Sequence, residues 1–260
     1  SSDVCSSDLI AYTYEANVDK KRAATVISFH ALGWLAGIAA AGIANDLRLI
    51  FLVSAASFLI GLMFTIKLPN PVQERELKPG TTKTVVLKNK FLFLSLLLRH
   101  IGAAAVWTIL PIMIVEKLGG ELYHISIVYV ANTVTAFVLM NVMASKIHLS
   151  NVTKFKIGIG CTTFVFIGLS VVTEWWMAMP FMALVGATWA FLFIGGNFHL
   201  MENNPKSTST GIFSSTLSIA TVIGPIIAGS IAFLFDYVAV MYFAIAIIIC
   251  AFVVSLKIKK

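Results

Sequence analysis

The sequence predicts an all-α, polytopic membrane protein with eight transmembrane helices. Apolar residues make up 58% of the 260-residue chain and charged residues only 12%, whereas a soluble domain is about half apolar and about a quarter charged. The charged residues gather in short clusters between long uncharged stretches. A buried soluble helical core would need outer helices with a polar face, and the pattern contains none.

Eight stretches are candidates for spanning helices, each of which needs about 20 mostly apolar residues. Only residues 45–48, which read Asn-Asp-Leu-Arg, separate the first two stretches, so we expect a tight polar turn there. In chain order the candidates cover residues 23–44, 49–66, 91–116, 122–145, 157–173, 175–199, 208–234 and 237–256.

The basic residues alternate with these stretches. With eight crossings, sixteen lysines and arginines fall in loops on one side of the membrane, and only Arg48 and Lys117 fall on the other. Because basic loops stay in the cytoplasm, we predict a multi-pass protein of the cell membrane with both ends cytoplasmic. The net charge of +7 then reflects topology and contacts with the headgroups of the lipid bilayer, which argues against a nucleic-acid partner.

The chain also contains an internal repeat. A shift of about 187 positions aligns Asn17 to Ala44 with Asn204 to Ile231, and a second long apolar segment follows each copy. Many secondary transporters are built from duplicated groups of membrane helices around a central site. The coincident pairs are Asn17 with Asn204, Ser28 with Ser215, Gly37 with Gly224, and Gly42 with Gly229.

Residues 1–9 fit neither a signal peptide nor a helix cap before a span. We interpret them as a non-native or artefactual segment, and the alternative is a genuine cytoplasmic segment. Ile10 to Glu15 then looks like the last turns of a helix whose beginning is missing. We therefore expect the chain to be the C-terminal part of a longer protein.

These features resemble the major facilitator superfamily (MFS) of secondary transporters, from the end of its fourth helix to its C-terminus. Thr210-Gly211 followed by Gly224-Pro225-Ile226-Ile227-Ala228-Gly229 is similar to a stretch of that family's helix 11, and Tyr14-Glu15 followed by Lys20-Lys21-Arg22 is similar to the junction entering helix 5. The chain departs from the family at Ile38, where efflux members often have proline, and in residues 141–156, which lack a glycine-aspartate core.

The resemblance implies an incomplete MFS-type helical bundle containing helices 5 to 12. Residues 10–68 would be the end of the N-terminal half, with helices 5 and 6. Residues 69–90 would be the cytoplasmic linker, and residues 91–260 would be the C-terminal six-helix half.

Polar groups inside a membrane are costly and therefore mark candidate sites. Arg99 and His100 lie about nine residues after Lys90, which is roughly 13 Å along a helix. Trp107 is seven residues after His100 and hence on nearly the same helical face. A cation and an indole could hold an anionic or aromatic substrate. The alternative is that Arg99 extends to the headgroups or caps a neighbouring helix end.

Other substrate-binding candidates come from helices 7, 8 and 10, which contribute to the central cavity in the resembled family. Tyr129 and Asn132 are three residues apart on one face of their span. Trp189 and Asn197 are eight apart and loosely share a face. His30 is a candidate proton relay, and the alternative is a neutral histidine hydrogen-bonded between helices.

Gly37, Gly224, Pro225 and Gly229 are candidates for gating or packing. Proline removes a backbone hydrogen bond and can kink its helix, while glycine admits a close neighbour. A flexing helix would serve alternating access, and static close packing is the other interpretation.

The predicted function is secondary active transport of a small solute by alternating access. The alternative is an intramembrane enzyme or a channel-like membrane protein. The chain has no HExxH or GxSxG motif and no aspartate inside a span, so we predict that it is not an enzyme and uses no cofactor or metal. Arg99 suggests an anionic group on the solute, while uptake or efflux, and coupling to a proton or sodium, stay open.

Overall fold

A computed structural model of the chain describes residues 20–44, 47–66 and 81–259. No strand occurs in these three ranges. The predicted non-native segment, residues 1–9, and residues 69–80 of the predicted linker lie outside the described residues. The elements are α2 (Lys20–Ala44), α3 (Leu47–Ile66), α4 (Thr81–Lys88), α5 (Lys90–Glu116), α6 (Leu122–Lys146), α7 (Asn151–Ser170), η1 (Trp175–Met177), α8 (Ala178–Asn203), α9 (Lys206–Leu234) and α10 (Tyr237–Ser255).

Seven of the described helical segments are long and apolar enough to cross a membrane, so the chain is a multi-pass membrane protein. Each of the seven coincides with a predicted span. The remaining predicted span, residues 49–66, folds as α3, but its apolar part, Arg48–Phe64, is shorter. Eight crossings therefore stay a prediction. The seven are Ala24–Ile43, Lys90–Glu116, Leu122–Val142, Asn151–Ser170, Trp175–Asn203, Lys206–Leu234 and Tyr237–Ser255.

Two local features differ from the predicted boundaries. α7 begins at Asn151 rather than near residue 157, because the Ser150 hydroxyl accepts a hydrogen bond from the Thr153 backbone N–H at 3.2 Å and caps the helix. The predicted linker also contains a helix, α4, whose Val85 is buried and which packs on α9. Part of the linker therefore belongs to the packed fold.

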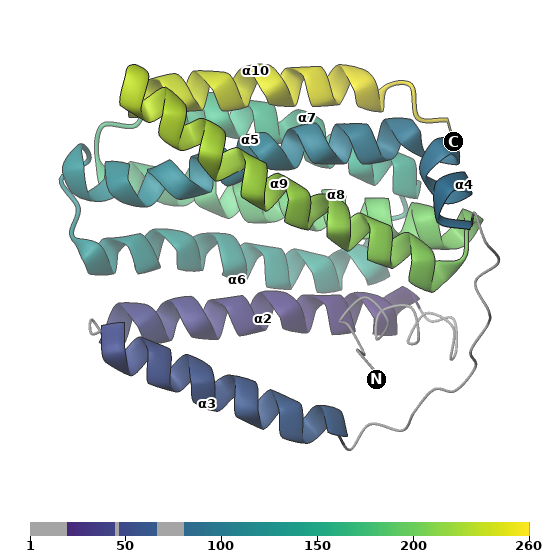
Figure 1. Cartoon of the computed structure of the whole chain (residues 1–260), viewed down its shortest axis with the longest axis horizontal. Helices are drawn as coiled ribbons and strands as arrows, with labels where there is room; N and C mark the ends of the chain where they lie inside the picture. The colour runs from purple at the N-terminus through teal and green to yellow at the C-terminus, as the bar shows by residue number, and fades with distance from the viewer. Residues whose placement is uncertain (1–19, 45–46, 67–80, 260) are drawn as a thin grey trace.

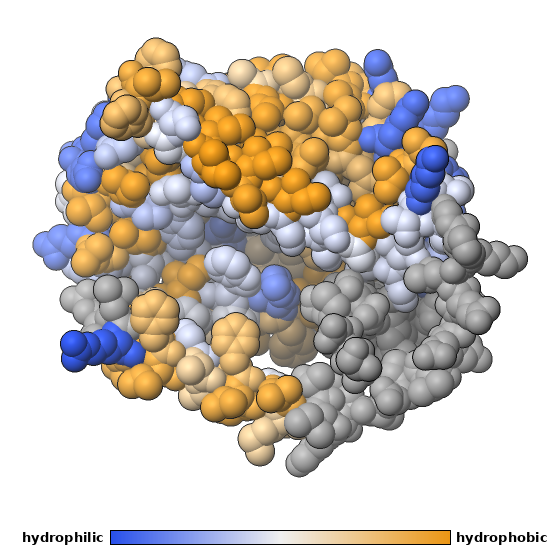
Figure 2. All heavy atoms as spheres, viewed as in Figure 1, coloured by the Kyte–Doolittle hydropathy of each residue, from blue (hydrophilic) through white to orange (hydrophobic). Residues whose placement is uncertain are grey.

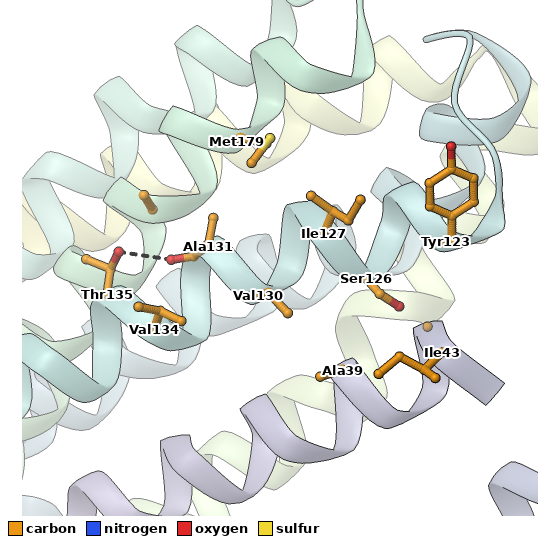
Figure 3. A pocket seen from close by; sticks show the side chains of 12 residues that line it. Ala39, Ile43, Tyr123, Ser126, Ile127, Val130, Ala131, Val134, Thr135 and Met179 are labelled. Atoms are coloured by element: carbon orange, nitrogen blue, oxygen red, sulfur yellow. Dashed lines mark hydrogen bonds between the residues drawn. The ribbon is translucent and has the colours of Figure 1, made fainter. Parts of the chain in front are cut away.

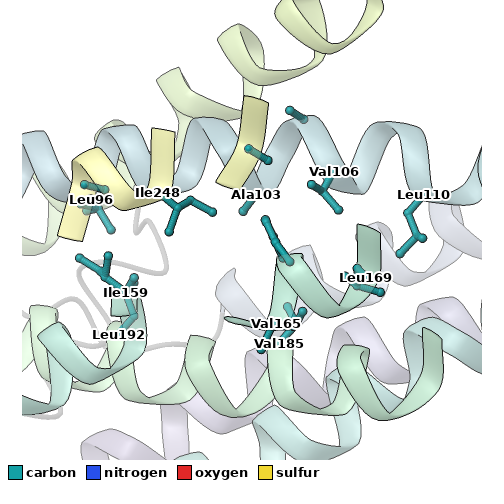
Figure 4. Close-up of a cluster of buried hydrophobic side chains, with 14 of the residues drawn as sticks. Leu96, Ala103, Val106, Leu110, Ile159, Val165, Leu169, Val185, Leu192 and Ile248 are labelled. Atoms are coloured by element: carbon teal, nitrogen blue, oxygen red, sulfur yellow. The ribbon is translucent and has the colours of Figure 1, made fainter. Parts of the chain in front are cut away.

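The helices run side by side with alternating directions (Figure 1). α5, α7, α8 and α10 surround a core of aliphatic and aromatic side chains, to which Leu96, Ile159, Leu192 and Ile248 contribute (Figure 4). α6 packs on α8 and also on α2. The layer formed by α2 and α3 therefore joins the six-helix unit α5–α10 mainly through α6 (Figure 1).

The helix ends predicted to be cytoplasmic gather at one end of the bundle, beside α4 and the C-terminus (Figure 1). There, Lys88 Nζ donates to the Asn203 carbonyl at 2.9 Å, and Lys156 Nζ donates to the Ile258 carbonyl at 3.0 Å. Cations at helix C-termini interact favourably with the helix dipole. Lys88 thus stabilises the C-terminal end of α8, and Lys156 holds the segment that follows α10.

Large apolar side chains are exposed on the outer surface of the bundle. Phe58 of α3 is 81% exposed and Phe233 of α9 is 89% exposed, and a broad hydrophobic area covers α9 and α10 (Figure 2). Several polar side chains, in contrast, are buried between the helices. This distribution suits a protein whose surroundings are lipid, where exposed polar groups are costly.

Two glycines bring the helices around Trp189 close together. Gly186 of α8 lies against the backbone of Asn132 in α6, and Gly158 of α7 lies against the backbone of Leu192 in α8. A Cβ atom at either glycine would overlap those backbone atoms, so these approaches require glycine. They hold α6 and α7 against the part of α8 that carries Trp189.

Candidate binding site

Arg99 is enclosed by protein in the N-terminal half of α5, with 0% of its surface exposed. Its Nη2 donates a hydrogen bond to Thr162 Oγ1 of α7 at 3.3 Å, and its Cζ lies 5.6 Å from the ring centre of Trp189 in α8. The Thr162 hydroxyl donates in turn to the Gly158 carbonyl at 2.6 Å, which leaves a lone pair for Arg99. The guanidinium therefore does not extend to the lipid headgroups.

Most of the hydrogen-bonding capacity of Arg99 is unused. Its Nε and Nη1 are buried and have no acceptor among the residues that the structure describes. Within the described ranges no carboxylate forms an ion pair with Arg99, and every described acidic residue is exposed. Burying an unpaired ion costs several kcal/mol, so an anion that reached this guanidinium would be strongly favoured. The exposed acidic residues are Glu116, Glu121, Glu174, Glu202 and Asp236.

His100 lies between two indoles and is 4% exposed. Its ring centre is 5.2 Å from that of Trp107, edge-on, and 5.5 Å from that of Trp189, tilted. The His100 Nδ1 and the Trp107 Nε1 are both buried without a hydrogen-bond partner. The structure thus brings together four residues that the sequence singles out: Arg99, His100, Trp107 and Trp189.

Tyr129 reaches this cluster from α6. Its hydroxyl donates to the Trp107 carbonyl at 3.0 Å. Because its proton is already donated, the hydroxyl is better placed to hold α6 against α5 than to donate to a ligand. Tyr129 therefore borders the cluster as a positioning residue.

The two asparagine candidates lie outside the cluster. Asn197 of α8 is 1% exposed, and its Nδ2 donates to the Phe193 carbonyl at 3.1 Å while its Oδ1 has no partner. Asn132 of α6 is half-buried beside Gly186. No hydrogen bond within the described ranges joins either asparagine to Arg99.

His30, the candidate proton relay, is exposed on α2. α2 packs mainly on α6, whereas the cluster around Arg99 is built from α5, α7 and α8. The structure therefore does not bring His30 into the cluster.

The four gating or packing candidates differ in their surroundings. A Cβ built on Gly224 of α9 would lie 2.7 Å from the Ile101 carbonyl oxygen and 3.0 Å from the Ala105 nitrogen in α5. A Cβ at Gly37 or Gly229 would have no atom within 4 Å in the described part of the chain. Pro225 lies inside α9, directly after Gly224. Gly224 thus supports the turn of α5 that follows Arg99 and His100.

Sequence reasoning missed Thr162, the residue that holds the Arg99 guanidinium. Its only sequence signal was a pair of threonines inside an apolar span. It also missed a cleft of about 570 Å³ between α2, α6 and the start of α8 (Figure 3). Ala39, Ile43 and Val130 are typical of its apolar lining, and no residue singled out as a candidate site lines it.

No metal site is evident: in the described ranges, no group of three or more His, Cys, Asp or Glu side chains could hold an ion. The chain matches no protein-family model, and a comparison with curated proteins found no match.

Proposed function

We propose that the chain belongs to a secondary active transporter that moves a small solute across the cell membrane by alternating access. In this proposal it contributes eight spanning helices, equivalent to helices 5 to 12 of an MFS-type bundle, with both ends in the cytoplasm. Arg99, His100, Trp107 and Trp189 form the solute site, and the solute carries an anionic group.

The observation that carries the proposal is the positive charge of Arg99, which pairs with no carboxylate within residues 20–44, 47–66 and 81–259. The guanidinium is fully buried inside a bundle of long apolar helices and has two nitrogens without an acceptor. An ionisable group in this setting is a candidate functional site, because its burial is costly unless a partner or ligand compensates it. A structural role would instead favour a partner carboxylate within the protein.

The arrangement of the helices supports alternating access. α2 meets the six-helix unit mainly along α6, and α6 also contacts the site through the hydrogen bond of Tyr129 to Trp107. A rocking motion of α2 and α3 against the six-helix unit would therefore act on a helix that borders the site. Rigid-body rocking of one helix group against another is a common form of alternating access.

The test is a transport assay with the full-length gene product in liposomes, using radiolabelled acetate, lactate and benzoate as a first panel. We expect saturable uptake of at least one anion, lost in Arg99→Ala and kept in the exposed control Arg48→Ala. Flux that rises linearly with concentration would favour a channel, and chemical conversion of the solute would favour an enzyme. Saturable uptake that is unchanged in Arg99→Ala would refute the assigned site.

A further inference from the structure

We propose that the ligand of Arg99 is an aromatic monocarboxylate. Its carboxylate pairs with the guanidinium, and its ring lies against the indoles of Trp107 and Trp189. The inference rests on the proposed function in treating the ligand as a transported solute, and it adds the chemical class of that solute.

The charge of the ligand follows from the free donors of Arg99. Nε and Nη1 carry three N–H groups, and neither nitrogen has an acceptor. A carboxylate oxygen accepts strong, charge-assisted hydrogen bonds from guanidinium N–H groups such as these. Among the described lysines and arginines, Arg99 alone is 0% exposed. A single negative charge neutralises this guanidinium.

The aromatic body follows from the exposure of the cluster. Arg99 and His100 are buried, whereas Trp107 and Trp189 are only half-buried. We place the ring of the ligand against these two indoles because they are the more exposed members of the cluster. Aromatic rings gain more from contact with indoles than their buried area alone provides. Trp107 Nε1 is a further buried donor without an acceptor, and it suits an oxygen on the ligand.

A phospholipid headgroup is the other source of an anion in a membrane. Arg99 lies nine residues into α5 from Lys90, or roughly 13 Å along the helix, and has no exposed surface. A headgroup phosphate would have to leave the interface to reach it and would bring no ring to the indoles. The structure thus favours a soluble carboxylate.

The test is equilibrium binding of radiolabelled benzoate to the purified full-length gene product in detergent. Competitors separate the two parts of the ligand: cyclohexanecarboxylate keeps the charge and size, acetate keeps only the charge, and benzylamine keeps only the ring. We expect saturable benzoate binding, with cyclohexanecarboxylate about 5-fold weaker. Acetate should be at least about 100-fold weaker, and benzylamine should not compete.

Two variants, each with a matched control, locate the binding. Arg99→Gln should weaken benzoate binding at least about 100-fold, whereas Arg48→Gln, at an exposed arginine of α3, should leave it unchanged. Trp189→Leu should weaken it about 5-fold, whereas Trp176→Leu, at an indole that is 54% exposed, should not. Removing an uncompensated buried charge should not unfold the protein, and thermal denaturation of each variant checks this.

Each outcome decides the proposal. Competition by acetate as strong as that by benzoate would overturn the aromatic part of the proposal, and competition as strong by benzylamine would overturn the anionic part. An absence of saturable benzoate binding to the wild type would overturn both. Displacement of benzoate by phosphatidylglycerol, dependent on Arg99, would assign the site to lipid headgroups. Benzoate binding at Arg99 without saturable uptake would keep the ligand class and refute transport. Saturable uptake of a cation, independent of Arg99, would keep the transport function and refute the aromatic carboxylate as its ligand.

Discussion

Gly224 of α9 offers a direct test of how tightly the helices pack behind the candidate site. A Cβ at this position would lie 2.7 Å from the Ala104 Cβ and 2.7 Å from the Ile101 carbonyl oxygen. Both distances are about 0.7 Å short of an ordinary 3.4 Å contact, and the carbonyl oxygen belongs to helical backbone. Gly224→Ala therefore forces α9 and α5 apart just beyond Arg99 and His100.

The magnitude follows from two opposing terms. Overpacking by one methyl group against rigid neighbours costs about 1–3 kcal/mol. Alanine in place of glycine inside a helix recovers up to about 1 kcal/mol of helix propensity. Gly229→Ala, on the same helix, gains the helix propensity without the packing cost, because a Cβ at Gly229 has no described atom within 4 Å. The difference in free energy of unfolding between the two variants therefore isolates the packing cost, about 1–3 kcal/mol.

The assay is equilibrium unfolding of the purified protein in mixed micelles with increasing sodium dodecyl sulfate, followed by far-ultraviolet circular dichroism. We expect Gly224→Ala to unfold at a lower fraction of dodecyl sulfate than Gly229→Ala, and Gly229→Ala to match or exceed the wild type. Variants whose free energies of unfolding agree within about 0.5 kcal/mol would refute the close approach of α9 and α5.

Three further predictions concern single side chains. Arg99→Ala should abolish uptake while leaving membrane insertion intact, because the alanine cannot pair with an anion; normal transport by a well-expressed variant would contradict the assigned role. Thr162→Val should lower the free energy of unfolding by about 1–3 kcal/mol, because another buried donor of Arg99 loses its acceptor. The same unfolding assay should show a smaller loss for the control, the neighbouring Thr163→Val, and equal losses would contradict the role of Thr162. Ser150→Ala should cost about 0.5–2 kcal/mol by removing the N-cap of α7. Thermal denaturation should show no comparable loss for Ser170→Ala, whose hydroxyl bonds back to its own helix, and equal losses would count against the cap.

Much of the fold could be predicted because membrane helices are defined by local properties. An apolar stretch of sufficient length in lipid must satisfy its backbone hydrogen bonds internally, which makes it helical. The seven long apolar helices accordingly coincide with predicted spans. The start of α7 was misplaced because hydropathy does not register a serine cap, and α4 was missed because its short segment is neither long nor strongly apolar.

The candidate site could be predicted only in part. His100 and Trp107 could be paired in advance because seven residues separate them on one helix. The contacts of Arg99 with Thr162 and Trp189 join three helices, and no spacing along the chain signals them. His30 was singled out as an isolated histidine in a span, yet it lies exposed on α2.

The sequence by itself determined which long apolar segments are helices, that the chain belongs in a membrane, and that Arg99 is a charge within a span. Only the tertiary structure decided which face of each helix is buried. It enclosed Arg99 against Thr162 and Trp189, and it packed Gly224 tightly while leaving Gly229 open. The physical reason is that a membrane helix is apolar on all sides, so its hydrophobic pattern does not mark a buried face. Close packing of small residues against neighbouring helices sets that rotation instead.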